Sequence, residues 1–537
     1  MFFKNKEGQN LHNLFFINFN MVVKIKYRRK SGVILVPMKL FGIIYMTPRR
    51  IQLSIIDLKK LTKIEDVFSN NFSNKNFQYD QNVEEIASAI NGYLQIAKDY
   101  GVKNVKLWGN QQQLNTISAR YLGEQIYIRT GLHIEWLSTS QLTYYKATAV
   151  TVHLDNFEKL SLMSTYLLSL GIERASLSHF NEQKFISTWN IDLGSSHVGE
   201  ISKALKLSTN DPVEVIEDYI GSKLEHLHHV FPYNKEGSNL VLQDAYALAQ
   251  KFIPANRSSY TMNIDEFEGI YATVIKSSDQ YLMDFFDVGE NDIGRIIPYF
   301  ILINKIIKMI NAQKIIITNI AVSDGLAIER AAKIGLMHLD LDGMILTSAE
   351  NLASRYLTSH THRQTVSKLA LHLFDQLKRI HHLGKRERLL LNVACIVDDI
   401  GNYINQQQHY RHSAYILEAT RLIGLSNDEN QIIAEVSRYH SNESPETDQP
   451  HFQKLEPTIQ MNVAKLSAIL RLADALDDSR EQKIKRISVS LRGSTMFIYA
   501  YSNQNIALEA WSFENKSALF KEVFGIHPIL KQRRRQK

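Results

Sequence analysis

Short apolar runs alternate with helical periodicity over residues 38–144. Strand-like runs lie at residues 41–46, 50–58, 104–108 and 133–138. Between the second and third runs, apolar residues recur at the three- and four-residue spacing of a helix that should end at Gly101. This alternation of strands and helices predicts an α/β unit over residues 38–144.

The same pattern continues over residues 145–338. A strongly apolar helix, residues 295–310, leads into a strand at residues 314–318 and then into a turn at residues 323–326. We therefore expect a second α/β unit, with boundaries at residues 145 and 338.

Beyond residue 339 the strand pattern gives way to consecutive helices. Residues 387–400 are apolar on most sides, which predicts a central buried helix, and Ser426 and Glu429 have the spacing of a capping box. These signals predict an all-helical unit over residues 339–483. Alternating apolar positions on both sides of Gly493 then predict a hairpin. With a final helix over residues 513–525, this makes residues 484–537 a small α+β tail.

The composition of the chain indicates its cellular compartment and whether it spans a membrane. The chain has 537 residues, 44% of them hydrophobic, and carries a net charge of +7. Its single cysteine, Cys395, lies in an apolar helix and is expected to be a core residue, which favours a reducing, cytoplasmic compartment. No apolar segment is long enough to predict a membrane span. Met38 directly precedes the first strand, so residues 1–37 are expected to be an upstream extension or the product of a misread start.

Basic residues are concentrated at the end of the chain, where the last seven residues, KQRRRQK, include five. This excess suits a polyanionic partner, although a solvated basic tail has the same composition. The charge by itself therefore leaves both interpretations open.

Histidines cluster in the helical unit, where nine of the 19 fall within residues 360–451. The sharper candidates for a metal site are His362, Asp398, Asp399 and Asp474. Their order resembles the HD superfamily of helical metal-dependent phosphohydrolases, with the second histidine of the motif replaced by Asp398. That replacement implies a vestigial site that keeps the fold. A remodelled site for Mg²⁺ or Mn²⁺ is the alternative.

Four separated motifs carry a second resemblance. IVDDIGNYINQQQHYRHSAYIL, SRYH, LRLADALDDSR and WSFENKSALFKEVFGIHPILKQRRR, in that order, resemble the C-terminal half of exopolyphosphatases of the Ppx/GppA family. The resemblance implies two actin-like ATPase (ribonuclease H-like) units before an HD-like helical domain. It also implies two phosphate loops, a glutamate base and Mg²⁺, with inorganic polyphosphate or a guanosine polyphosphate as substrate.

The chain departs from the family's pattern at the positions of the first phosphate loop and of the catalytic glutamate. Tyr45 stands at the aspartate of the first phosphate loop, and the glutamate position falls at Gln141 or Leu142. No catalytic residue of the family is therefore intact. A Gly-Ser match at residues 192–196 is more typical of an ordinary turn. The remaining candidates for binding phosphate are Arg49, Arg50, Ser323 and Gly325.

Three functions follow from this pattern. The favoured one is a relative that binds polyphosphate or a guanosine polyphosphate while hydrolysis is weak or lost. The alternatives are a fully active exopolyphosphatase that uses Mg²⁺, and an HD-type metal-dependent phosphohydrolase. A homodimer, or pairing with an active paralogue, stays open, and nucleic acid is not an expected partner.

Overall fold

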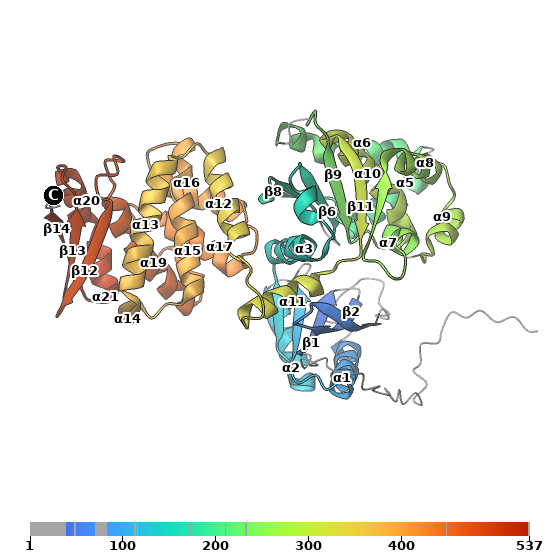
Figure 1. Cartoon of the computed structure of the whole chain (residues 1–537), viewed down its shortest axis with the longest axis horizontal. Helices are drawn as coiled ribbons and strands as arrows, with labels where there is room; N and C mark the ends of the chain where they lie inside the picture. The colour runs from blue at the N-terminus through green and yellow to red at the C-terminus, as the bar shows by residue number, and fades with distance from the viewer. Residues whose placement is uncertain are drawn as a thin grey trace, which may run out of the picture. The chain divides into compact units, whose positions relative to one another are not determined.

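A computed structural model describes residues 39–47, 50–69, 83–111, 114, 116–171, 174–209, 211–230, 234–290, 292–446 and 448–534 (Figure 1). The extension expected over residues 1–37, Arg49 of the first phosphate loop and the last three residues of the basic tail lie outside the described residues. None of the helices described is both long enough and apolar enough to cross a membrane.

The first sheet has the strand order β3-β2-β1-β4-β5. Its first three strands form an antiparallel meander, and β4 and β5 continue it in parallel with β1. The elements of this unit are β1 (Leu40–Thr47), β2 (Arg50–Asp57), β3 (Thr62–Ser69), α1 (Val83–Asp99), β4 (Val105–Asn110), α2 (Thr116–Thr130), β5 (Ile134–Leu137) and α3 (Thr139–His153).

The second sheet repeats this arrangement with one extra strand. Its order is β10-β11-β9-β6-β7-β8, in which β6, β7 and β8 form the meander and β9 and β11 run parallel to β6. The strands are β6 (Thr165–Leu170), β7 (Ala175–Asn181), β8 (Lys184–Ile191), β9 (Ser238–Gln243), β10 (Ser259–Asn263) and β11 (Ala312–Thr318). The shared order confirms the prediction of two ribonuclease H-like, actin-like units.

Helices accompany the second sheet and connect it with the first. They are α4 (Phe157–Leu160), α5 (Ser195–Ser208), α6 (Pro212–Val230), α7 (Tyr246–Phe252), α8 (Ile264–Val274), α9 (Asp279–Phe286), the 3-10 helix η2 (Ile293–Arg295), α10 (Ile296–Ile310) and α11 (Val322–Lys333). One apolar core contains residues of both sheets together with residues of α3 and α11. These two helices therefore hold the facing parts of the α/β region.

The helical unit and the tail share another core, to which β12, β13, α20 and α21 contribute as well as the preceding helices. Cys395 is buried in it, as predicted. The elements are α12 (Gly343–Arg355), α13 (His360–Gln376), α14 (Lys378–His381), α15 (Lys385–Val397), η3 (Ile400–Tyr403), α16 (His409–Ala419), α17 (Asn427–Arg438), α18 (Pro450–Gln453), α19 (Pro457–Ala475), β12 (Arg486–Arg492), β13 (Thr495–Tyr501), α20 (Ala507–Lys516), α21 (Ala518–Phe524) and β14 (His527–Arg533).

Two local predictions were wrong. The turn expected at residues 323–326 is the first part of α11, where the Asp324 carboxylate accepts the Ala321 N–H at 2.7 Å and so satisfies a donor at the helix start. The single final helix is divided into α20 and α21 at Ser517. The hydroxyl of Ser517 donates to the Glu514 carbonyl, and this local hydrogen bond competes with the helical pattern.

Candidate functional site

The carboxyl ends of the parallel strands in the second sheet carry a small polar network. Lys146 Nζ of α3 lies 2.5 Å from Asp244 Oδ2, just after β9, and donates to Ser169 Oγ of β6 at 2.9 Å. Ser169 Oγ donates in turn to Asp244 Oδ2 at 3.0 Å. Open α/β sheets bind their ligands at this edge. Here the protein's own ammonium and carboxylate neutralise each other at that position.

The first sheet faces the same network. Burial and the nearby Asp244 carboxylate raise the pKa of the Tyr45 phenol on β1, which keeps that side chain neutral. The Arg50 guanidinium lies 3.5 Å from the centroid of the Phe68 ring, and its Nε is buried without a hydrogen-bond partner among the described residues. Arg50 therefore lies against an aromatic ring. Burial lowers the pKa of its guanidinium, and the Asp244 carboxylate is near enough to oppose that shift.

Gln141 and Leu142, which stand at the position of the family's glutamate, have structural roles in this chain. Gln141 completes the N-terminal capping box of α3, because its side chain accepts the Ser138 N–H at 3.0 Å while its own N–H bonds Ser138 Oγ. Leu142 is buried in the core that joins the sheets. Neither side chain supplies a base at neutral pH. The absence of an intact catalytic residue stays a prediction.

Ser323 and Gly325 both lie buried on α11, whereas Arg50 lies on β2. A Cβ atom on Gly325 would lie 2.1 Å from the Tyr145 carbonyl oxygen. Close packing of α11 on α3 thus accounts for the glycine without any bound phosphate. The phosphate-binding role of the four predicted residues stays a prediction.

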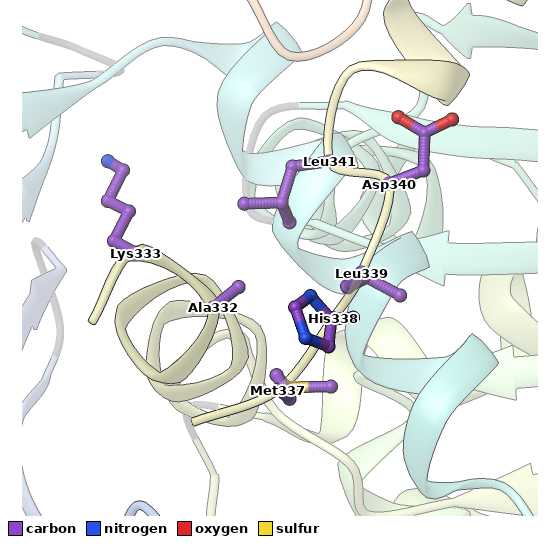
Figure 2. A pocket seen from close by; sticks show the side chains of 7 residues that line it. All are labelled: Ala332, Lys333, Met337, His338, Leu339, Asp340 and Leu341. Carbon is purple, nitrogen blue, oxygen red and sulfur yellow. The ribbon is translucent and has the colours of Figure 1, made fainter. Parts of the chain in front are cut away.

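A shallow pocket of about 390 Å³ opens where α11 leads into the linker before α12. Figure 2 shows its lining, in which the Lys333 and Asp340 side chains point away from each other. Asp340 Oδ1 accepts the backbone N–H groups of Asp342 and Gly343, and this carboxylate therefore serves the start of α12. The lining offers no group of catalytic side chains.

The four metal candidates of the helical unit do come together. His362 lies near the start of α13, Asp398 and Asp399 follow α15, and Asp474 lies near the end of α19. His362 Nε2 is 3.3 Å from Asp474 Oδ1 and 4.0 Å from Asp399 Oδ2. All four residues are buried or nearly so. The helical fold thus gathers side chains that are up to 112 positions apart in the sequence.

Protein cations already occupy part of this cluster. Arg480 Nη2 lies 2.5 Å from Asp399 Oδ2, and Lys516 Nζ lies 2.5 Å from Asp474 Oδ2. Both nitrogens of the His362 ring contact carboxylates, since Nδ1 is 2.8 Å from Asp477 Oδ2. Burial alone would lower the pKa of His362, but its hydrogen bonds to Asp474 and Asp477 raise it to about 10. An imidazolium has no free lone pair for a metal.

Asp398, which replaces the second histidine of the HD motif, differs from its neighbour in charge. Burial, followed by repulsion from Asp399 and Asp474, raises the pKa of Asp398 well above its ordinary value. Burial acts in the same direction on Asp399, but the Arg480 guanidinium holds the pKa of Asp399 below its ordinary value. Of the adjacent pair, Asp399 is therefore the anion.

Two residues that were not singled out from the sequence complete a different cluster with Asp399. His409 at the start of α16 and His440 just after α17 place their Nε2 atoms 3.5 and 3.9 Å from Asp399 Oδ1 and 3.1 Å from each other. Ligand atoms held about 2.0–2.2 Å from one metal ion lie roughly 3–4 Å apart. The three atoms therefore fit a single metal ion.

The hydrogen bonds behind the two imidazoles also suit a metal. His409 Nδ1 donates to the Gln406 carbonyl at 3.1 Å, and His440 Nδ1 donates to the Ser437 carbonyl at 2.6 Å. A carbonyl only accepts, so each neutral ring carries its proton on Nδ1 and turns a lone pair on Nε2 toward the other ring. Two lone pairs at 3.1 Å require a proton or a cation between them. Metal-bound histidines commonly have this backing bond.

Comparison with known proteins found one matching family model and several similar solved structures. Residues 346–516 match the family model described as Ppx/GppA phosphatase, domain III. A solved Ppx/GppA family member from Aquifex aeolicus is similar at 13% identity and a TM-score of 0.45, over 56% of this chain and 99% of that one. An exopolyphosphatase from Cytophaga hutchinsonii is similar at 12% identity and a TM-score of 0.45, over 56% of this chain and 100% of that one.

The matched segment contains all of the metal candidates, the first three motifs that carried the sequence resemblance and the start of the fourth. It begins within α12 and ends at Lys516, the last residue of α20. Residues 346–516 are therefore similar to domain III of the Ppx/GppA phosphatases.

Proposed function

We propose that this protein binds a phosphate polymer, either inorganic polyphosphate or a guanosine polyphosphate, without hydrolysing it in the α/β cleft. The observation that carries the proposal is the Lys146, Asp244 and Ser169 network at the ligand-binding edge of the second sheet. This ion pair occupies the Asp244 carboxylate, which is therefore not free to hold Mg²⁺ against a phosphate. The match of residues 346–516 to a Ppx/GppA phosphatase domain and the net charge of +7 support a polyanionic ligand.

The first prediction concerns orthophosphate release from long-chain polyphosphate. We expect the purified full chain to release none above the blank with Mg²⁺ or Mn²⁺, while it binds the polymer with an affinity that falls steeply as salt rises. Release is measured colorimetrically, and binding is measured by equilibrium dialysis at two salt concentrations.

Two variants locate any activity that contradicts this expectation. Release that survives Asp399→Ala and disappears in Lys146→Met would place hydrolysis in the α/β cleft and overturn the proposal. Release that disappears only in Asp399→Ala would move the reaction to the helical unit. Circular dichroism of each variant checks that it is folded, and failure to bind polyphosphate at low salt would also contradict the proposal.

A second candidate function, metal-dependent phosphohydrolysis in the helical unit, is favoured by the Asp399, His409 and His440 cluster. The mixed imidazole and carboxylate set suits a divalent transition metal such as Mn²⁺ better than Mg²⁺. A bound metal would supply Lewis acidity and an acidic water molecule. Arg480 and Lys516, which already pair with the neighbouring carboxylates, would attract the phosphate group of a substrate.

The second prediction tests this site by metal content. We expect the chain, after equilibration with Mn²⁺ or Zn²⁺ and removal of free ions, to retain about one metal ion, because three convergent ligands are already positioned. His409→Ala and His440→Ala should each reduce retention by 10-fold or more. Retention is measured by elemental analysis.

The matched control is His226→Ala, which removes an exposed imidazole from α6. This variant should retain metal like the wild type. Equal metal content in all four proteins, or none in the wild type, would leave the cluster as a hydrogen-bonded imidazole pair.

A further inference from the structure

The C-terminal sheet, formed by β12, β13 and β14, carries aromatic and basic residues on its outer face. In β13, Met496, Ile498 and Ala500 are buried and contribute to the core shared with the helices. Because side chains alternate along a strand, the intervening residues of β13 and of its neighbours point to the opposite face. Figure 1 shows these three strands next to α20 and α21 at the C-terminal end of the chain.

Three aromatic rings follow one another along the central strand of this outer face. They belong to Phe497, Tyr499 and Tyr501, and all three side chains are half-buried. The Phe497 and Tyr499 rings are stacked, with centroids 6.4 Å apart and an interplanar angle of 23°. Alternate residues of a strand are about 6.7 Å apart, so the rings form a regular row.

Cations flank this row on both edge strands. On β12, the Arg486 guanidinium lies 5.3 Å from the Tyr501 centroid, and the Arg492 guanidinium lies 5.8 Å from the Phe497 centroid. On β14, Lys531 Nζ is 4.4 Å from the Phe497 centroid. The Arg533 guanidinium is 3.8 Å from the Tyr499 centroid. All four basic residues are exposed.

No acidic residue interrupts this surface. The strands read RISVSLR, TMFIYAY and HPILKQR, and none of them contains Asp or Glu. Strand pairing places Arg486 opposite Tyr501 and Tyr501 opposite Arg533, so that one row across the sheet is cation, ring, cation. Hydrogen bonds from Ser488 and Arg533 lower the pKa of the Tyr501 phenol, which agrees with a positive potential at the face.

We propose that this face, formed by Phe497, Tyr499 and Tyr501 with Arg486, Lys531 and Arg533, binds single-stranded nucleic acid. Rings in a row offer stacking platforms to successive unstacked bases, and the flanking cations are placed to bind the phosphates between them. Inorganic polyphosphate has no bases, so it would engage the cations alone. A duplex keeps its base faces covered and gains nothing from the rings.

This proposal differs from the expectation that nucleic acid is not a partner. The sequence showed the basic residues at the chain end, but strand pairing is what places rings and cations from β12, β13 and β14 on one face. The proposal is independent of the polar network of the second sheet and of the Asp399, His409 and His440 cluster, because none of its residues belongs to either.

The test is fluorescence anisotropy with a labelled 12-nucleotide oligo(U) or oligo(dT) and the full chain. We expect salt-dependent binding that a matched duplex does not reproduce. The double variant Phe497→Leu with Tyr499→Thr keeps apolar or β-branched residues on the strand. It should weaken binding by about 5- to 100-fold for each ring removed, and leave the affinity for linear polyphosphate unchanged.

The charge variant Arg486→Gln with Lys531→Gln should weaken binding of both polymers and reduce the salt dependence. The matched control Lys103→Gln removes an exposed cation before β4 and should change neither. If circular dichroism shows that the ring variant does not fold, the charge variant and the comparison with the duplex together test the proposal. Absence of single-strand binding by the wild type, equal affinity for the duplex, or full affinity in a folded ring variant would each overturn the proposal.

Discussion

Replacement of Gly325 with alanine is expected to lower the free energy of unfolding by about 3 kcal/mol or more. The new methyl group would lie 2.1 Å from the oxygen and 2.7 Å from the carbon of the Tyr145 carbonyl, far inside contact distance. Both atoms are backbone, so no side-chain rotation relieves the clash, and α11 must move away from α3. Urea unfolding followed by circular dichroism measures the change.

The control for this prediction is Gly269→Ala on α8. Gly269 is also helical. Apart from its chain neighbours and the backbone of its own helix, no heavy atom lies within 4 Å of a Cβ atom added there. Alanine should therefore raise stability there by about 0.5–1 kcal/mol. A Gly325→Ala protein of normal stability that binds polyphosphate weakly would contradict the packing interpretation and favour the predicted phosphate contact.

Much of the fold could be predicted because its signals are local. The period of apolar residues identified α1, α10 and α15. The capping box of Ser426 and Glu429 marked the start of α17, where the Ser426 side chain accepts the Glu429 N–H at 3.1 Å. Alternating apolar positions around Gly493 likewise predicted the β12 and β13 pair. Periodicity and caps depend on residues within one or two turns, so sequence alone contains them.

The site was only partly predictable, because its contacts join distant helices. His362, Asp399 and Asp474 were found from the order of a known motif, and the structure places a carboxylate oxygen of each aspartate within 4.0 Å of His362 Nε2. His409 and His440 were merely two histidines among nine, and only the packing of α16 on α17 turns both toward Asp399. Their backing bonds to Gln406 and Ser437 carbonyls have no signature in the sequence.

The charge states in this region also depend on tertiary structure. The sequence shows Asp398 and Asp399 as an equivalent pair, but Arg480, 81 positions beyond Asp399, bonds only the second of them. Lys516 of α20 similarly pairs with Asp474 from a separate helix. The sequence alone could not pair Lys516 with Asp474, because that pairing depends on the packing of α20 against α19.

The last prediction concerns Glu435, a fully buried carboxyl on α17. Its Oε1 accepts from Gln431 Nε2 at 3.1 Å, while its Oε2 has no hydrogen-bond partner among the described residues. Burial raises the pKa of Glu435 to about 7 from an ordinary 4.5, although Arg438 opposes the shift. The folded protein therefore favours the protonated acid.

The sign of the pH dependence follows from this raised pKa. Below pH 4.5 both the folded and unfolded states carry the protonated acid, and the carboxyl costs nothing. As pH rises from 4.5 through 7, stability is lost, because the unfolded state releases a proton that the folded state still holds. The full loss is about 3 kcal/mol. Glu435→Gln keeps the shape and the Gln431 bond acceptor, so it should be about 3 kcal/mol more stable than the wild type at pH 8 and only about 1 kcal/mol more stable at pH 5.

Urea unfolding of both proteins at the two pH values gives this difference, with exposed Glu522→Gln as the matched control that should change stability by less than about 0.5 kcal/mol at either pH. Arg438 Nε lies 3.4 Å from Glu435 Oε2 and is the group that could reverse the result. If the ion pair outweighed burial, Glu435→Gln would destabilise the protein at pH 8, since it would leave the buried guanidinium nitrogen without its carboxylate. The direction of the change at pH 8 thus decides whether α17 holds a neutral acid or a buried ion pair.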